Sequence, residues 1–162
     1  MNQVDKTNLH MSHRVCSQGW ALTILRLVLG SIFILHGGQK VFGLFGGPGL
    51  EGFVAWIGTM GVPEWLAYLA AFAELIGGAM MFLGIAAEIG ALLTMGVMIG
   101  AVIVVHWPNG YFGQNGGFEY PFNLALFALA VVVGGPGKHP LWDPCRVWRL
   151  CLFNSCCKKT TI

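Results

Sequence analysis

The stretch that decides the fold is PEWLAYLAAFAELIGGAMMFLG at residues 63–84, an apolar run whose two charges are Glu64 at its start and Glu74 near its middle. A helix rises about 1.5 Å per residue, so a run of this length can cross the roughly 30 Å hydrocarbon core of a bilayer. Its apolar residues are continuous rather than alternating, which favours a helix over a barrel strand. Pro63 suits the first turn of a helix. The run predicts a transmembrane helix.

Three further apolar runs occupy residues 19–38, 88–107 and 119–135, and the last is the shortest. Only 10% of the 162 residues are charged, against about 25% in an ordinary soluble domain. The 24 glycines suit helices that pack closely in lipid. The sequence therefore predicts an all-α integral membrane four-helix bundle over residues 19–135, with glycine-rich outer loops.

The basic residues of the flanks predict how the bundle is oriented. They lie before the first run and after the last one, whereas the first and third loops contribute only Lys40. Because Lys and Arg concentrate on the cytoplasmic side, we expect both termini in the cytoplasm of a bacterial cytoplasmic membrane. Residues 1–18 are then an N-terminal tail, and residues 136–162 a cysteine-containing tail with a short interfacial helix. Residues 39–62 and 108–118 would lie outside.

Several polar side chains stand within these spans or at their ends. An ionisable group at the centre of a membrane costs about 2.5–3.5 kcal/mol on insertion scales, so it usually faces a partner or a cavity. Arg26 and Glu74 each lie ten residues from the expected outer end of their helices, or about 15 Å. The sequence predicts an Arg26–Glu74 ion pair near mid-membrane. It would either fix the helix register or take part in proton or substrate handling.

The outer mouth of the bundle is the predicted site. His36 and Lys40 are neighbours at i and i+4, and the segment HWPNGYFGQNGGFEY brings His106 and Glu119 to the same side. Imidazoles exchange protons near pH 7 and can hydrogen-bond the carbonyl oxygens of a quinone. Further ring and amide contacts are expected from Trp56, Trp107, Asn109 and Tyr111.

A metal site is the competing interpretation of the same mouth. His36, His106 and Glu119 would make a three-ligand set, although no paired spacing on one helix supports it. The five cysteines lie outside the apolar runs and lack the paired spacing of zinc sites. We therefore assign no metal.

Three motifs resemble the signatures of the DoxX family, in the same order, over about residues 19–135. They are RLVLGSIFILHGGQKVFGLFGGPGLEGF at residues 26–53, AFAELIGGAMMFLG at residues 71–84 and HWPNGYFGQNGGFEY at residues 106–120. The resemblance implies a four-helix membrane bundle and a component of a quinone-linked oxidoreductase. Members are associated with thiosulfate oxidation as a quinone-reductase subunit and with resistance to redox or quinone stress. The family-like polar positions are Arg26, His36, Lys40, Glu74, His106 and Glu119.

The leading interpretation is a membrane component of a quinone-linked oxidoreductase that binds a quinone or small redox substrate at the outer mouth. His36 and His106 would hold the ring oxygens and pass protons, Lys40 would stabilise negative charge, and Glu119 would orient a histidine. The sequence has no flavin, nicotinamide, haem or iron–sulfur motif, so electrons would come through a second redox subunit, a soluble redox enzyme or a small reductant.

A non-enzymatic membrane protein is the alternative, either a small-molecule or metal carrier or a scaffold that recruits soluble redox enzymes. The sequence leaves open whether the chain is catalytic by itself and whether it forms a homo-oligomer. The net charge of +2 and the lack of a basic patch set nucleic acid aside as a partner.

Overall fold

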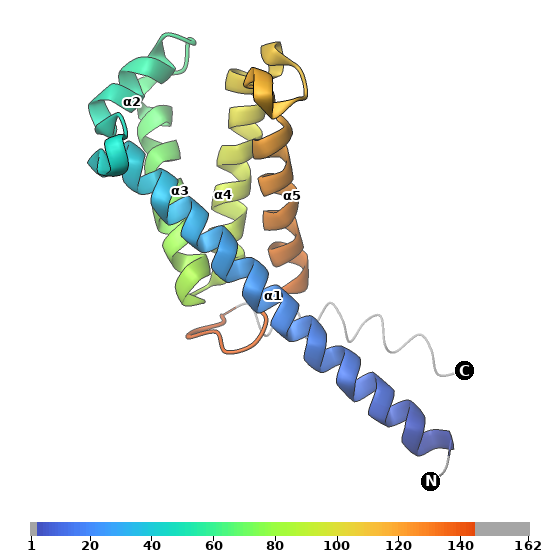
Figure 1. The fold of residues 1–162 in the computed structure, drawn as a ribbon. Helices are drawn as coiled ribbons and strands as arrows, with labels where there is room; N and C mark the ends of the chain where they lie inside the picture. The colour runs from blue at the N-terminus through green and yellow to red at the C-terminus, as the bar shows by residue number, and fades with distance from the viewer. Residues whose placement is uncertain (1–2, 145–162) are drawn as a thin grey trace.

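The protein is described here by a computed structural model, which gives the backbone of residues 3–144 and the side chains of residues 19–144. Four apolar helices pack side by side and a shorter one lies at one end (Figure 1). The α-helices are α1 (Gln3–Phe42), α2 (Gly49–Gly58), α3 (Glu64–Leu83), α4 (Ala87–Ala101) and α5 (Glu119–Gly134). Short helical segments join them: η1 (Leu44–Gly46), the π-helix η2 (Val102–His106), η3 (Trp107–Asn109) and η4 (Gly113–Asn115). The predicted all-α membrane fold is confirmed.

In the part of the chain that the structure describes, three helical segments are long and apolar enough to cross a membrane, Gly19–Phe42, Glu64–Leu83 and Ala87–Asn109. They imply a lipid bilayer as the environment of the chain. The fourth predicted span forms α5, whose 16 residues reach about 24 Å, less than the hydrocarbon core. Helix α1 also continues through residues 3–18 and extends beyond the bundle (Figure 1). The predicted interfacial helix and the C-terminal cysteines lie outside the described residues.

Helices α1 and α3 run antiparallel with their backbones in contact. A Cβ added to Gly37 would lie 2.7 Å from the Cα of Leu75, and one added to Gly78 would lie 2.8 Å from the backbone nitrogen of Ile34. Small residues at such positions let membrane helices approach closely. These contacts fix the register of α1 against α3.

Helices α3 and α4 touch at one end and separate toward the other. Near the turn that joins them, a Cβ on Gly77 would lie 2.7 Å from the carbonyl oxygen of Gly90. Gly84 begins this turn with φ 71°, in the left-handed region that favours glycine. Away from the turn the two helices diverge (Figure 1). Helix α2 packs there against α3, through a buried cluster that includes Phe53 and Ala71.

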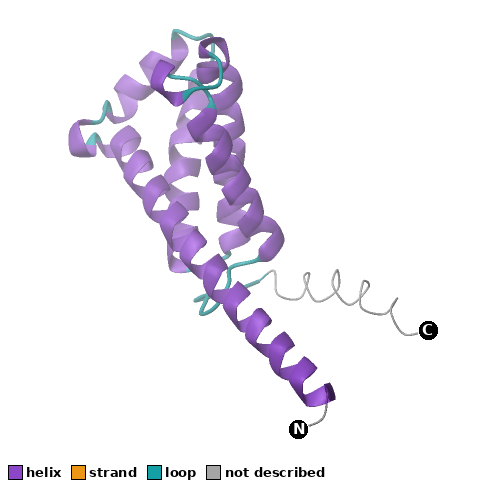
Figure 2. Cartoon of the chain, turned by 45° about the vertical axis from the view of Figure 1, so that its right-hand side comes forward, coloured by secondary structure: helices purple, strands orange, loops and turns teal. Residues whose placement is uncertain are grey.

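The bundle therefore has two unlike ends, both visible in Figure 2. We call the end that carries α2 and residues 106–119 the α2 end, and the end that carries the α3–α4 turn the turn end. At the turn end the chain folds back after α5. The backbone nitrogen of Lys138 donates to Thr23 Oγ1 at 2.7 Å, and that of Trp142 donates to the oxygen of Gly84 at 3.1 Å. The main core, around Leu29 and other buried side chains, lies between the ends.

Candidate functional site

Arg26 lies at the turn end and does not pair with Glu74. The arginine is 3% exposed, and its Nη1 donates to the backbone oxygens of Met81 at 2.7 Å and Phe82 at 3.1 Å. Both carbonyls belong to the last turn of α3, where C=O groups have no partner within the helix. A cation at a helix C-terminus is also favoured by the helix dipole. The predicted Arg26–Glu74 ion pair is wrong, because Arg26 caps α3 instead.

Glu74 is paired with Lys40 at the α2 end. The Lys40 ammonium donates to the Glu74 carboxylate and lies 5.1 Å from the centre of the Phe53 ring. The Glu74 side chain is 2% exposed and that of Lys40 is 23% exposed. A buried carboxylate without such a partner would be strongly destabilising, and the ring face adds a cation–π attraction. The buried Glu74 carboxylate thus holds the Lys40 ammonium, which remains partly accessible.

The helix register explains why the predicted pairing failed. Counting from His36 and from the start of α3 placed Arg26 and Glu74 at equal depth. In the structure Gly37 lies against Leu75, so His36 is level with the middle of α3. The first part of α3 packs against α2 instead, which a count of residues cannot reveal. Arg26 consequently lies beside the end of α3.

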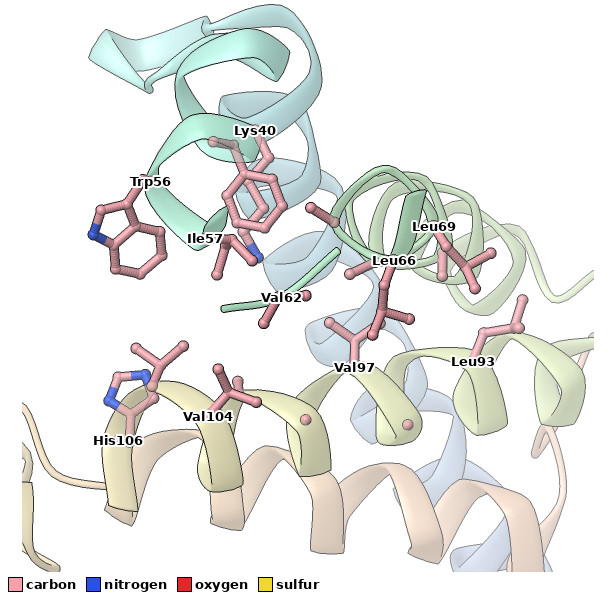
Figure 3. A pocket seen from close by; sticks show the side chains of 18 of the residues that line it. Lys40, Trp56, Ile57, Val62, Leu66, Leu69, Leu93, Val97, Val104 and His106 are labelled. Atoms are coloured by element: carbon pink, nitrogen blue, oxygen red, sulfur yellow. The ribbon is translucent and has the colours of Figure 1, made fainter. Parts of the chain in front are cut away.

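An apolar cavity of about 520 Å³ lies between α3 and α4, beneath α2. Its volume is within the range of about 300–1,000 Å³ typical of small-molecule sites. Phe53, Trp56 and Ile57 of α2 cover its upper part, and Lys40 and His106 are the ionisable side chains among its described lining residues. Figure 3 shows Lys40 and His106 on opposite walls of this space. The cavity combines an apolar body with one cation and one imidazole at the same end.

His106 ends the π-helical segment η2, a distortion of α4 of a kind that is frequent at functional sites. Its Nδ1 lies 2.7 Å from the backbone oxygen of Gly116. A carbonyl oxygen only accepts, so Nδ1 carries the hydrogen. Nε2 is then left for a ligand: it accepts a hydrogen bond when the ring is neutral and donates one when the ring is protonated. The protein backbone therefore sets which imidazole nitrogen is available.

His36 and Glu119 are also at the α2 end, but they are not among the residues that line this cavity. The Nε2 of His36 lies 3.4 Å from the Tyr120 hydroxyl, and the two rings meet edge to face at 6.2 Å. Glu119 Oε2 accepts from the backbone nitrogen of Gly113 at 3.0 Å, so it does not orient a histidine. The predicted convergence of four groups is wrong, and only the lysine of α1 and the histidine of η2 share the cavity.

The metal alternative finds no support in the geometry. Among the side chains of residues 19–144, no group of three or more His, Cys, Asp or Glu is placed to hold a metal ion. His36, His106 and Glu119 face different neighbours, as described above. The described geometry therefore does not bring these three residues together as one ligand set.

Three of the predicted substrate-binding residues stabilise the loop between α4 and α5 instead. Trp107 stacks on Phe118 with ring centres 5.5 Å apart, and Tyr111 meets the same ring edge to face at 5.4 Å. Asn109 Nδ2 donates to the oxygen of Gly116 at 3.2 Å, the acceptor that also fixes the cavity histidine. These residues position that histidine without lining the cavity. Of the four predicted residues, only the tryptophan of α2 lines it.

Sequence reasoning missed two glycines that shape the cavity, Gly96 and Gly100 of α4. Both line it, and a Cβ added to either would meet nothing within 4 Å. Their spacing of four residues placed them on one helix face and was a usable signal. It would have been interpreted as a helix-packing motif, because glycines so spaced usually mark close contact in membranes. Tyr120, the partner of His36, was also missed.

The fold and the cavity define a small all-α membrane protein with a ligand-sized space open between two of its helices. The DoxX family model matches residues 21–107, which run from α1 to the start of η3. The chain is also 36% identical over 108 residues to the Bacillus subtilis (strain 168) protein called "Putative oxidoreductase CatD", covering 67% of this chain and 75% of that relative. The chain belongs to the DoxX family. No solved structure matches it.

Proposed function

We propose that this protein is the membrane component of a quinone-linked oxidoreductase and that it binds a quinone head group at the α2 end of the cavity. The observation that carries the proposal is an apolar cavity whose described ionisable lining is limited to Lys40 and His106. A quinone is a flat ring with two opposed oxygens, so it matches two polar groups on opposite walls. Phe53 and Trp56 of α2 supply aromatic surface for the ring.

His106 is the proton-exchanging group in this proposal. Reduction of a quinone adds two electrons and two protons, and oxidation of the hydroquinone releases them. The neutral imidazole accepts a hydrogen bond from a hydroquinone hydroxyl at Nε2, and on oxidation it takes that proton. In the reverse direction the imidazolium donates from Nε2 to a quinone oxygen. The bond from Nδ1 to Gly116 keeps the ring in the tautomer that this exchange needs.

Lys40 has a different role, because its ammonium offers positive charge to the ligand and exchanges no proton with it in this proposal. It lies at the same end of the cavity and can face a ring oxygen as negative charge develops there. Glu74 holds the ammonium in place and offsets the free-energy cost of its partial burial. His106 exchanges one of the two protons, and the second proton and the two electrons are exchanged with a partner, a second redox subunit or a soluble redox enzyme. This assignment agrees in kind with the name of the B. subtilis relative.

The orientation in the membrane is part of the proposal. The flanks of the bundle carry the basic residues, while the loops at the α2 end contribute only Lys40. By the positive-inside rule the α2 end then faces outward and both termini face the cytoplasm.

The two histidines at the α2 end provide a matched test. Protein purified in mild detergent is titrated with a short-tailed hydroquinone, and binding is followed by quenching of tryptophan fluorescence. His106→Leu removes the acceptor at Nε2 and is expected to weaken binding about tenfold, which corresponds to the loss of one hydrogen bond. His36→Leu alters a histidine at the same end but outside the cavity, and is expected to leave the affinity within about twofold.

Two results would count against the proposal. One is no binding of quinone or hydroquinone by the wild-type protein, and the other is an equal loss in both histidine variants. Binding that depends on His106 without any electron exchange in the presence of membrane extract would favour the carrier alternative over the oxidoreductase.

A further inference from the structure

The cavity extends well beyond the place of a quinone ring. Its lining follows α4 from His106 down to Leu92, a distance of about 20 Å along a helix. Below Lys40 and His106 the described lining residues are aliphatic or glycine. A small soluble ligand would fill only the upper end, whereas the lower part suits an occupant that is long and apolar.

Gly96 and Gly100 make the lower part of the cavity hollow. Elsewhere in the bundle glycine brings backbones together, as at Gly77, where a Cβ would lie 2.7 Å from the oxygen of Gly90. At Gly96 and Gly100 a Cβ would meet nothing within 4 Å. These two glycines therefore pack against no described part of the chain, and the space that side chains would fill remains open.

The lower part of the cavity faces the acyl chains of the bilayer rather than water. Among its lining residues, Leu66 is 40% exposed, Leu69 56% and Leu92 54%. All three lie within segments long and apolar enough to span a membrane. The opening between α3 and α4 is therefore lateral, toward lipid, and a ligand dissolved in the membrane reaches it without leaving the hydrocarbon.

We propose that this groove holds the prenyl tail of a membrane-dissolved quinone, which enters sideways between α3 and α4 with its ring toward Lys40 and His106. The inference rests on the proposed function and adds the class of quinone and its route. A phospholipid fits less well, because α2 covers the upper end with Phe53, Trp56 and Ile57. Its bulky head group would lie beneath that cover, and its two chains exceed a single groove. A quinone has one flat ring, which fits beneath α2, and one chain, which fits a single groove.

Filling the groove with a side chain tests the inference. Gly96→Leu places an aliphatic side chain in the open space, and Ile99→Phe is the matched control. Ile99 is 46% exposed and is not among the lining residues. Two quinones with the same ring are compared, one with a single isoprene unit and one with several. Gly96→Leu is expected to weaken binding of the long-tailed quinone by about tenfold while the short-tailed quinone and the control stay unchanged.

A second measurement separates failure of the groove from failure of the quinone site. A photoreactive prenyl alcohol, which has no quinone ring, is crosslinked to wild-type protein in vesicles of saturated phospholipid. The groove is supported if α3 and α4 are labelled, if long-tailed quinone competes with this labelling, and if Gly96→Leu abolishes it.

If the short-tailed quinone binds but Gly96→Leu changes neither the binding of the long-tailed quinone nor the labelling, the groove inference is overturned and the proposed function stands. Labelling that added phospholipid removes as readily as quinone overturns the inference as well. Absence of any quinone binding defeats the proposed function, and with it the quinone as the groove's occupant.

Discussion

The two ends of the bundle use the same residue types in opposite ways. At the turn end Gly77 brings the backbones of α3 and α4 together, and Arg26 donates through Nη1 to two carbonyls in the last turn of α3. At the α2 end Gly96 leaves open space, and the cation Lys40 lies on a cavity wall. Glycine and a basic side chain thus serve packing at one end and access at the other.

This difference indicates that one end of this small membrane protein provides rigidity and the other provides access for a ligand. The turn end is joined by backbone contact, by the Arg26 cap and by the segment that folds back after α5. Because α3 and α4 are fixed there, they can diverge at the α2 end without the bundle losing its register. Regions that admit ligands are generally those with fewer packing contacts. Variants at each end test whether packing at the turn end and ligand access at the α2 end are separate.

The largest effect is expected from removing Lys40. Lys40→Met leaves the Glu74 carboxylate buried without its partner, which destabilises by about 3–5 kcal/mol when a buried pair is broken. The double variant Lys40→Met with Glu74→Gln removes the charge as well and should recover most of this loss. The free energy of unfolding is measured by denaturant titration in micelles, followed by circular dichroism. A loss below about 1 kcal/mol in the single variant would show that the pair is effectively solvated.

An intermediate effect is expected at the turn end. Arg26→Met removes charge-assisted hydrogen bonds to two α3 carbonyls and should lower the free energy of unfolding by about 1.5–3 kcal/mol. Binding of a short-tailed quinone to the folded fraction should stay within about twofold of wild type. Arg26→Lys keeps a donor and should lose less stability. If Arg26→Met abolished quinone binding while the protein remained folded, the two ends would not be functionally separate.

The smallest effects come from a pair of glycine substitutions with opposite signs. Gly77→Ala inserts a methyl group against the Gly90 carbonyl and should destabilise the bundle by about 1–3 kcal/mol. Gly96→Ala adds the same group in open space and should stabilise α4 by about 0.5–1 kcal/mol through helix propensity. Thermal unfolding in detergent compares the two variants directly. Equal effects at both positions would contradict the contrast between the packed and the open end.

The four apolar helices were predictable from the sequence, and so were three of the residues that line the cavity. Helix α2 was not, because residues 39–62 were predicted to be a glycine-rich loop. The apolar runs gave three spans and a short fourth helix with bounds close to those observed. Lys40, His106 and Trp56 were among the predicted site residues and line the cavity. His36 and Glu119 were placed at the correct end, but their partners, Tyr120 and a backbone nitrogen, could not be derived from spacing.

What the sequence determined by itself is that this chain forms helices in a lipid bilayer, because hydropathy adds up locally along each run. What only the tertiary structure decided is which polar groups meet. The register of α1 against α3 pairs Glu74 with Lys40 and places Arg26 beside the C-terminus of α3. The packing of α2 against α3 covers the upper part of the cavity that Gly96 lines. Both depend on contacts between segments far apart in the chain, which no single run of residues encodes.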